Sequence, residues 1–308
     1  MLYFTLCTSH FLCGVDNYSG KNYEHHRGWV EQRLLFLSSI FSIDICAYAV
    51  MSNHVHVLLH VDVKQVQAWT DKVVVERWHR LHIGTLLTQM FIRGHALSQG
   101  QQLTLDDTIV EYRKRLYDIS WLMRNLNECI TRQANKEDEC TGRFWEGRFK
   151  SQALLDDAAL LSCMAYVDLN PIRANIADTP ETSKHTSIKK RLESIQQSTT
   201  HSLMPFVGNP RQDMPKGIAF SFKDYFELVD LTDRIIRNDK AGNIDHQHQP
   251  ILQRLGLSDE QWLTLTTEFE KHFCYATGAE QMMNQFKHHT GHQRIRGMGK
   301  AKTLLRCA

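Results

Sequence analysis

Two neighbouring runs, Ile43–Val50 and residues 55–61, constrain the fold most, because both read as β-strands. Each is rich in β-branched and aromatic residues. Leu2–Cys7 predicts an earlier strand, and residues 23–41 repeat apolar side chains with a period near 3.6, which indicates a helix. The order strand, helix, strand, strand predicts an α+β sheet with helices on one face.

The rest of the chain predicts mainly helices, and its composition suggests where domains begin and end. Helices are expected over residues 64–87, 108–135 and 156–169, the last with an aspartate at its N-cap and a proline beyond its end. The sequence divides into a first domain over residues 1–180, a polar, proline-containing linker over 181–220 with one short helix near 188–196, and a helical accessory domain over 221–308. Amphipathic helices are expected there over 221–237 and 258–277.

The basic tail after Glu280 contains six lysines and arginines and no acidic residue. Such a tail suits a phosphate backbone, but a solvated, disordered end has the same composition. The full chain of 308 residues carries a net charge of only +2, so any nucleic-acid binding must come from local clusters of cations.

The eight cysteines contain no C-x-x-C pair, which argues against a zinc ribbon or a thioredoxin-like site. The apolar start has no basic n-region, so the sequence does not predict a secretion signal. The cysteines are therefore expected to be reduced thiols in the cytosol. No stretch approaches the roughly 18 apolar residues that span a membrane, so no membrane partner is predicted.

His54 and His56 form the central chemical signal. Alternate residues of a strand share a face, so both imidazoles should point the same way, while Val55 and Val57 point into a core. Two imidazoles on a rigid strand are half of a divalent-metal site, and Mg²⁺ would require an oxygen ligand and waters in addition. His60 shares the face as a further ligand or a supporting group. The alternative is a pair of half-buried histidines bonded to backbone or water.

Tyr166 and Asn170 form the second signal, because residues four apart lie on one helix face. A tyrosine hydroxyl held near a metal-bound phosphate can attack phosphorus, giving a phosphotyrosine and a free 3′ hydroxyl, and the strand can be rejoined without ATP. Asn170 precedes Pro171 at the expected helix end and offers a carbonyl oxygen as a third metal ligand. The alternative is a core tyrosine whose hydroxyl bonds to backbone.

Residues 142–151 interleave cations with aromatic rings. Cations there would meet phosphates, and rings could stack on unpaired bases. The alternative is an amphipathic strand with its aromatic rings in the core, Phe149 foremost. The cations are Arg143, Arg148 and Lys150, and the rings are Phe144, Trp145 and Phe149.

Together, the His54-Val-His56 strand, residues 142–150 and residues 166–174 resemble the bacterial REP-associated tyrosine transposases, which are single-tyrosine HUH transposases. The resemblance covers residues 1–180. It implies a ferredoxin-like antiparallel sheet, the HUH endonuclease domain, with Mg²⁺ or Mn²⁺ held by His54 and His56, Asn170 assisting, and Tyr166 as the nucleophile.

The resemblance also implies a function and partners. The expected enzyme nicks and rejoins single-stranded DNA at hairpin-forming palindromic repeats through a 5′-phosphotyrosine intermediate, in the bacterial cytoplasm and associated with the nucleoid. Monomer and homodimer both stay open. The expected DNA-contacting residues are Arg143, Trp145, Arg148, Lys150 and Arg173.

Two other readings compete. A histidine-triad nucleotide hydrolase would need a third histidine where Leu58 stands, so the strand does not fit that class. A repressor that binds DNA or RNA hairpins without chemistry stays open, because residues 5–13 lack the arginine that transposases of this kind carry after the first strand.

Overall fold

The computed structural model describes residues 1–7, 13–15, 20–147, 149–199, 202–209, 211–237 and 249–305. Arg148, one of the predicted DNA contacts, lies outside these ranges. Within them, no helix combines the length and the apolar character needed to cross a membrane.

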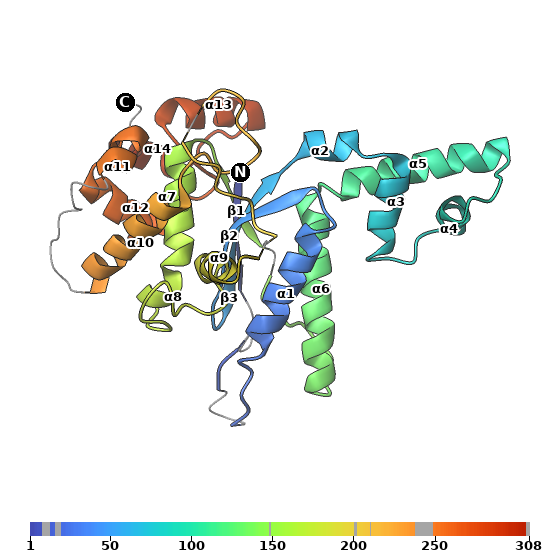
Figure 1. The fold of residues 1–308 in the computed structure, drawn as a ribbon, viewed down its shortest axis with the longest axis horizontal. Helices are drawn as coiled ribbons and strands as arrows, with labels where there is room; N and C mark the ends of the chain where they lie inside the picture. The colour runs from blue at the N-terminus through green and yellow to red at the C-terminus, as the bar shows by residue number, and fades with distance from the viewer. Residues whose placement is uncertain are drawn as a thin grey trace. The chain divides into compact units, whose positions relative to one another are not determined.

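The sheet has five strands in the order β2-β3-β1-β4-β5. Figure 1 labels β1, β2 and β3 of this sheet. Strand β1 pairs antiparallel with both β3 and β4, and β4 pairs parallel with the short β5. The predicted α+β class is therefore confirmed as a mixed sheet with many helices. The strands are β1 (Leu2–Cys7), β2 (Ile43–Val50), β3 (His54–Val61), β4 (Lys150–Leu154) and β5 (Ala276–Thr277).

Most predicted helices are present, but two are divided. The one expected over residues 108–135 forms two helices, Gln99–Arg115 and Ile119–Glu137, and Asp118 is the N-cap of the second. The one expected over residues 64–87 is divided as well. Thr70 begins a new helix there, because its side chain accepts a hydrogen bond from the Val73 backbone N–H. The helices are α1 (His26–Ser38), α2 (Val63–Ala68), α3 (Asp71–His79), α4 (Leu86–Ile92), α5 (Gln99–Arg115), α6 (Ile119–Glu137), α7 (Asp157–Asp168), α8 (Asn170–Arg173), α9 (Ser187–Gln196), α10 (Phe222–Arg237), α11 (Gln249–Leu255), α12 (Asp259–His272), α13 (Glu280–Thr290) and α14 (Met298–Leu304).

Contacts divide the described chain into two units. The sheet unit comprises residues 1–27, 45–59 and 146–308, and the helical unit comprises residues 28–44 and 60–145. The predicted boundaries at residues 180 and 220 both fall inside the sheet unit. The C-terminal helices therefore pack with the sheet in one contact unit.

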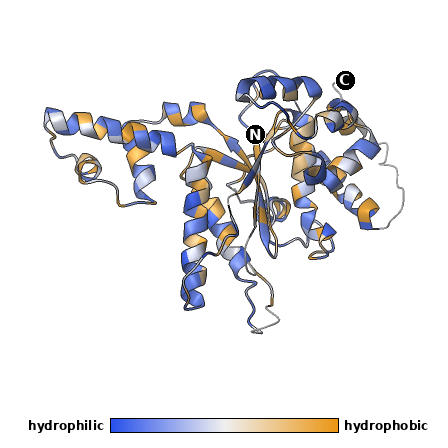
Figure 2. Cartoon of the chain, turned by 180° about the vertical axis from the view of Figure 1, so that it is seen from behind, coloured by the Kyte–Doolittle hydropathy of each residue, from blue (hydrophilic) through white to orange (hydrophobic). Residues whose placement is uncertain are grey.

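Helix α7 is the centre of the sheet unit. Every residue from Ala159 through Asp168 is buried, and α7 packs against both β4 and α12. Apolar residues surround its axis, as expected for a helix enclosed on all sides, and Figure 2 shows hydrophobic residues along it. The basic tail contributes to the same core, since Ala301 and Leu304 of α14 are buried.

The C-terminal end of α7 is fixed by Asp168. Its carboxylate accepts hydrogen bonds from the Tyr225 hydroxyl at 2.7 Å, the Ser187 hydroxyl at 2.6 Å and the Ile188 backbone N–H at 3.3 Å. Burial raises the pKa of Asp168, and these hydrogen bonds oppose the shift. The short helix predicted near residues 188–196 is thus confirmed as α9, and it is bound directly to α7.

The helical unit has its own core. Trp78 stacks on Tyr112 with ring centroids 4.6 Å apart and meets Trp121 edge to face at 5.4 Å. Arg115 lies 4.3 Å from the Trp121 ring centroid, a cation–π contact that covers the cluster.

Candidate functional site

The two histidines of β3 face the same side of the sheet. Their ring centroids are 4.6 Å apart, and His56 lies opposite Thr5 of β1 in the strand register. His56 is buried. Its Nδ1 forms a hydrogen bond with the Tyr3 hydroxyl, while its Nε2 is buried without a hydrogen-bond partner. His54 Nδ1 lies 2.6 Å from the Asn53 side-chain oxygen, to which it must donate.

The environment disfavours the charged form of both imidazoles. Burial lowers the pKa of His56 well below its usual value, and the charges of His54 and Arg173 add to this. Burial also lowers the pKa of His54, although Glu270 opposes the shift. Neutral imidazole is the form that binds metal ions.

Tyr166 of α7 reaches the histidine pair. Its ring meets His56 edge to face with centroids 6.0 Å apart, and it packs against Tyr3 at 6.4 Å and Phe269 at 5.9 Å. The residue is only 8% exposed. Burial and the charge of Glu270 raise the pKa of Tyr166, and the Arg173 guanidinium opposes them.

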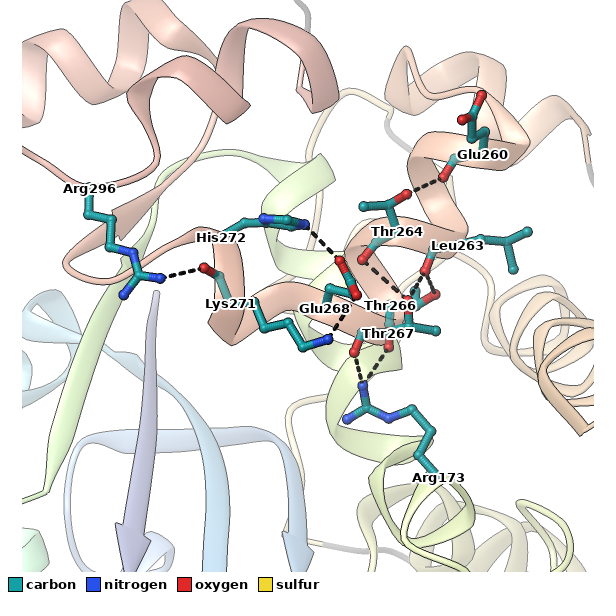
Figure 3. A network of polar contacts seen from close by, with 10 residues as sticks. All are labelled: Arg173, Glu260, Leu263, Thr264, Thr266, Thr267, Glu268, Lys271, His272 and Arg296. Carbon is teal, nitrogen blue, oxygen red and sulfur yellow. Dashed lines mark hydrogen bonds and ion pairs between the residues drawn. The ribbon is translucent and has the colours of Figure 1, made fainter.

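Arg173 connects Tyr166 with helix α12. Its guanidinium carbon lies 4.0 Å from the Tyr166 ring centroid. The same guanidinium donates to the backbone carbonyls of Thr266 at 3.3 Å and Thr267 at 2.5 Å (Figure 3). The backbone of α12 leaves helical geometry at the next residue, Glu268. Arg173, the last residue of α8, therefore links α8 to α12 beside Tyr166.

Glu270 of α12 is a site residue that the sequence did not reveal. Its carboxylate accepts hydrogen bonds from the hydroxyls of Tyr3 and Thr5, each at 2.7 Å, and lies 3.8 Å from His56 Nδ1. Tyr3 and Thr5 alternate on β1 beside β3, so strand pairing could have indicated them. No local pattern connects Glu270 with the histidines.

The arrangement fits half of a divalent-metal site. Each histidine engages its Nδ1, which leaves the opposite nitrogen for a ligand bond, and the buried Nε2 of His56 has no other partner. Within the described ranges, no third histidine, cysteine or carboxylate places a ligand atom within 4.8 Å of those of both His54 and His56. The remaining ligands would therefore be amide, substrate or water oxygens.

Asn170, the predicted third ligand, is buried at the first position of α8, directly after α7 ends. Its role as a ligand stays a prediction. His60 instead pairs with Asp44, whose carboxylate oxygen lies 3.0 Å from its Nδ1.

The predicted DNA contacts have different environments. Trp145 is only 7% exposed, and its indole N–H donates to the Asn127 carbonyl at 3.2 Å. Little of its ring is therefore available to a base, which matches the alternative of a core aromatic. Arg143 and Lys150 are exposed. Phe149 packs edge to face on Phe4 with centroids 5.3 Å apart.

A cavity of about 520 Å³ has in its wall Tyr3 and Glu270, two residues that contact His56 Nδ1. The aromatic side chains of Phe149, Phe273 and Tyr275 line it, with the cations of Lys150 and Arg296. Tyr275 is 51% exposed. Rings and cations in one cavity suit unpaired nucleotides, since bases stack on rings and phosphates pair with cations.

No family model matches the sequence, and no curated protein matches it. Among solved structures, the chain is similar to one described as "Structure of the REP associates tyrosine transposase bound to a REP hairpin". The match has a TM-score of 0.36 and 8% sequence identity, and it covers 70% of this chain and 90% of the other. This is a distant structural relation.

Proposed function

We propose that this protein is a metal-dependent enzyme that nicks and rejoins single-stranded DNA, with Tyr166 as the nucleophile. The observation that carries the proposal is the approach of Tyr166, on α7, to within 6.0 Å of His56, on β3, measured between ring centroids. A phenol and two imidazoles from distant parts of the sequence therefore lie close together. That combination of groups suits phosphodiester chemistry.

The sheet order supports a ferredoxin-like HUH endonuclease fold. Strands β2, β3, β1 and β4 are neighbours in that order, with α1 between β1 and β2 along the chain. This is the order of a ferredoxin-like sheet. Strand β3 lies between β2 and β1 in this sheet, so the histidine pair is next to the polar side chains of β1.

The proposed reaction forms one bond and breaks one. The Tyr166 oxygen attacks phosphorus, the bond from phosphorus to the 3′ oxygen breaks, and the phenol proton ends on the 3′ hydroxyl. The product is a 5′-phosphotyrosine, whose bond energy allows rejoining. Mg²⁺ or Mn²⁺, held by His54 and His56 with Asn170 assisting, would supply polarisation of a phosphate oxygen.

Arg173 would favour the reactive form of Tyr166, because its positive charge lowers the pKa of that phenol. The Tyr166 side chain is buried, and Phe269 is one of the rings that pack against it. Attack therefore requires side chains around the Tyr166 ring to move aside as the strand enters from the adjacent cavity. Lys150 and Arg296 would then bind its phosphates, with a hairpin-forming repeat as the proposed substrate.

The test is covalent attachment of DNA. The protein is incubated with Mn²⁺ and a pool of 3′-labelled single strands that carry a hairpin and randomised flanks, and denaturing gels detect the labelled adduct. Tyr166→Phe should abolish the adduct, whereas the matched variant Tyr117→Phe, in the helical unit, should retain it. An adduct that persists in Tyr166→Phe would exclude this nucleophile.

A second function is favoured by the burial of Tyr166 and the raised pKa of its phenol. A hairpin-binding repressor would keep the fold and the cation-lined cavity without the reaction. Retention of labelled DNA on the native protein, with no adduct at any Mn²⁺ concentration, would support that alternative.

A further inference from the structure

Three side chains from two separate segments meet around Nδ1 of His56, which lies on β3. Tyr3 and Thr5 come from β1, and Glu270 comes from α12 near the other end of the chain. The Tyr3 hydroxyl bonds to both His56 Nδ1 and the Glu270 carboxylate, and the Thr5 hydroxyl lies 2.7 Å from the same carboxylate oxygen. The opposite nitrogen of His56, Nε2, is buried without a partner.

Proton counting assigns the direction of these hydrogen bonds. An ionised carboxylate only accepts, so Glu270 takes one proton from Tyr3 and one from Thr5. Each hydroxyl has a single proton, and a carboxylate is a stronger acceptor than a neutral imidazole. The Tyr3 oxygen is then left as an acceptor, and the proton between it and His56 belongs to Nδ1.

We propose that Tyr3 and Glu270 are positioning residues that hold His56 with its proton on Nδ1, so that the Nε2 lone pair is presented to a divalent cation. The proposal rests on the proposed function and extends it: helix α12 completes the support of the metal site, although it contributes no direct ligand. A metal-binding histidine commonly donates its second nitrogen to a carboxylate, and here a tyrosine hydroxyl lies between the two.

The size of the effect follows from that role. Groups that orient a metal-binding histidine typically change metal affinity about 10- to 100-fold when removed. Without Glu270, the Tyr3 proton turns to His56 Nδ1, and the imidazole proton moves to Nε2. A cation must then displace that proton before it can bind.

The tautomer is measured first, on the full-length protein without metal, by nitrogen-15 NMR of labelled histidine. His56→Ala identifies the signal. The wild type should show His56 protonated on Nδ1, and Glu270→Ala should move the proton to Nε2. A wild-type His56 protonated on Nε2 overturns the proposal, whatever the outcome of the DNA reaction.

Metal affinity is measured next, by calorimetric titration of the full chain with Mn²⁺. Tyr3→Phe and Glu270→Ala should each weaken binding at least tenfold, and the double variant should be little weaker than either, because both belong to one chain of hydrogen bonds. The matched controls are Tyr117→Phe and Glu268→Ala. Glu268 lies on the same helix but pairs with Lys271 and His272. Both controls should bind like the wild type.

The results separate this proposal from the proposed function. Wild-type affinity in both Tyr3→Phe and Glu270→Ala overturns the positioning role, even if the DNA adduct on Tyr166 forms. A wild type that binds no Mn²⁺ and forms no adduct overturns the proposed function, and this inference with it. Glu270 is 41% exposed and Tyr3→Phe removes one oxygen atom, so both variants should fold.

Discussion

Replacement of Asp168 tests how the tyrosine helix is held in place. Asp168→Ala removes the acceptor of three hydrogen bonds at the end of α7. The Tyr225 hydroxyl is fully enclosed, and an unpaired buried hydroxyl costs about 1–3 kcal/mol. Ser187 can turn to the Tyr48 carbonyl, 3.3 Å away, so its loss is smaller.

The expected loss of unfolding free energy for Asp168→Ala is about 3 kcal/mol, near the low end for breaking a buried charged network. The low end applies because burial already raises the pKa of Asp168, so its removal also relieves a desolvation cost. Asp168→Asn retains an acceptor oxygen and should lose about 1 kcal/mol.

The assay is urea unfolding followed by circular dichroism, with exposed Asp178→Ala as the control. The control should stay within about 0.5 kcal/mol of the wild type. An Asp168→Ala variant as stable as the control would refute the assignment of this carboxylate as the anchor of α7.

Further variants probe the core, the cavity and the nucleophile. Trp262 is fully buried and donates to Thr232, so Trp262→Ala should cost about 3–5 kcal/mol in urea unfolding, and a loss below 1 kcal/mol would contradict its place in the core. The double variant Lys150→Ala, Arg296→Ala should weaken single-stranded DNA binding, and the slope of log affinity against log salt concentration should fall by the equivalent of about two phosphate contacts. Fluorescence anisotropy at several salt concentrations would measure this slope, and an unchanged slope would exclude the cavity as the DNA site. Because the raised pKa of Tyr166 leaves little phenolate at neutral pH, the single-turnover rate of adduct formation should rise about tenfold per pH unit from pH 7 to 9, and a flat profile would contradict a rate set by phenol ionisation.

The local elements of the site could be predicted from sequence. Alternation in β3 predicted that His54 and His56 share a face, and their rings do lie side by side. Helical spacing placed Tyr166 near the end of a helix that stops before Pro171, as α7 does. Both follow from patterns within about ten residues, where backbone geometry alone decides which side chains are neighbours.

Long-range packing could not be predicted in the same way. The capping-box pattern at Ser258 indicated the start of α12, but nothing in its sequence indicates that Glu270 meets β1. Trp145 illustrates a second limit, because a ring between cations suits both a base and a core, and only its burial distinguishes them. The division of residues 64–87 depended on Thr70, whose capping role competes with continuous helical periodicity.

The central claim is that two imidazoles and one phenol act on a single phosphodiester. It is tested most directly by a crystal structure of the protein soaked with Mn²⁺ and a single-stranded oligonucleotide, with anomalous scattering used to locate the manganese. We expect one manganese peak within bonding distance of Nε2 of both His54 and His56, with a phosphate between it and the Tyr166 oxygen. A manganese peak elsewhere, or a phosphate that cannot reach Tyr166, would contradict it.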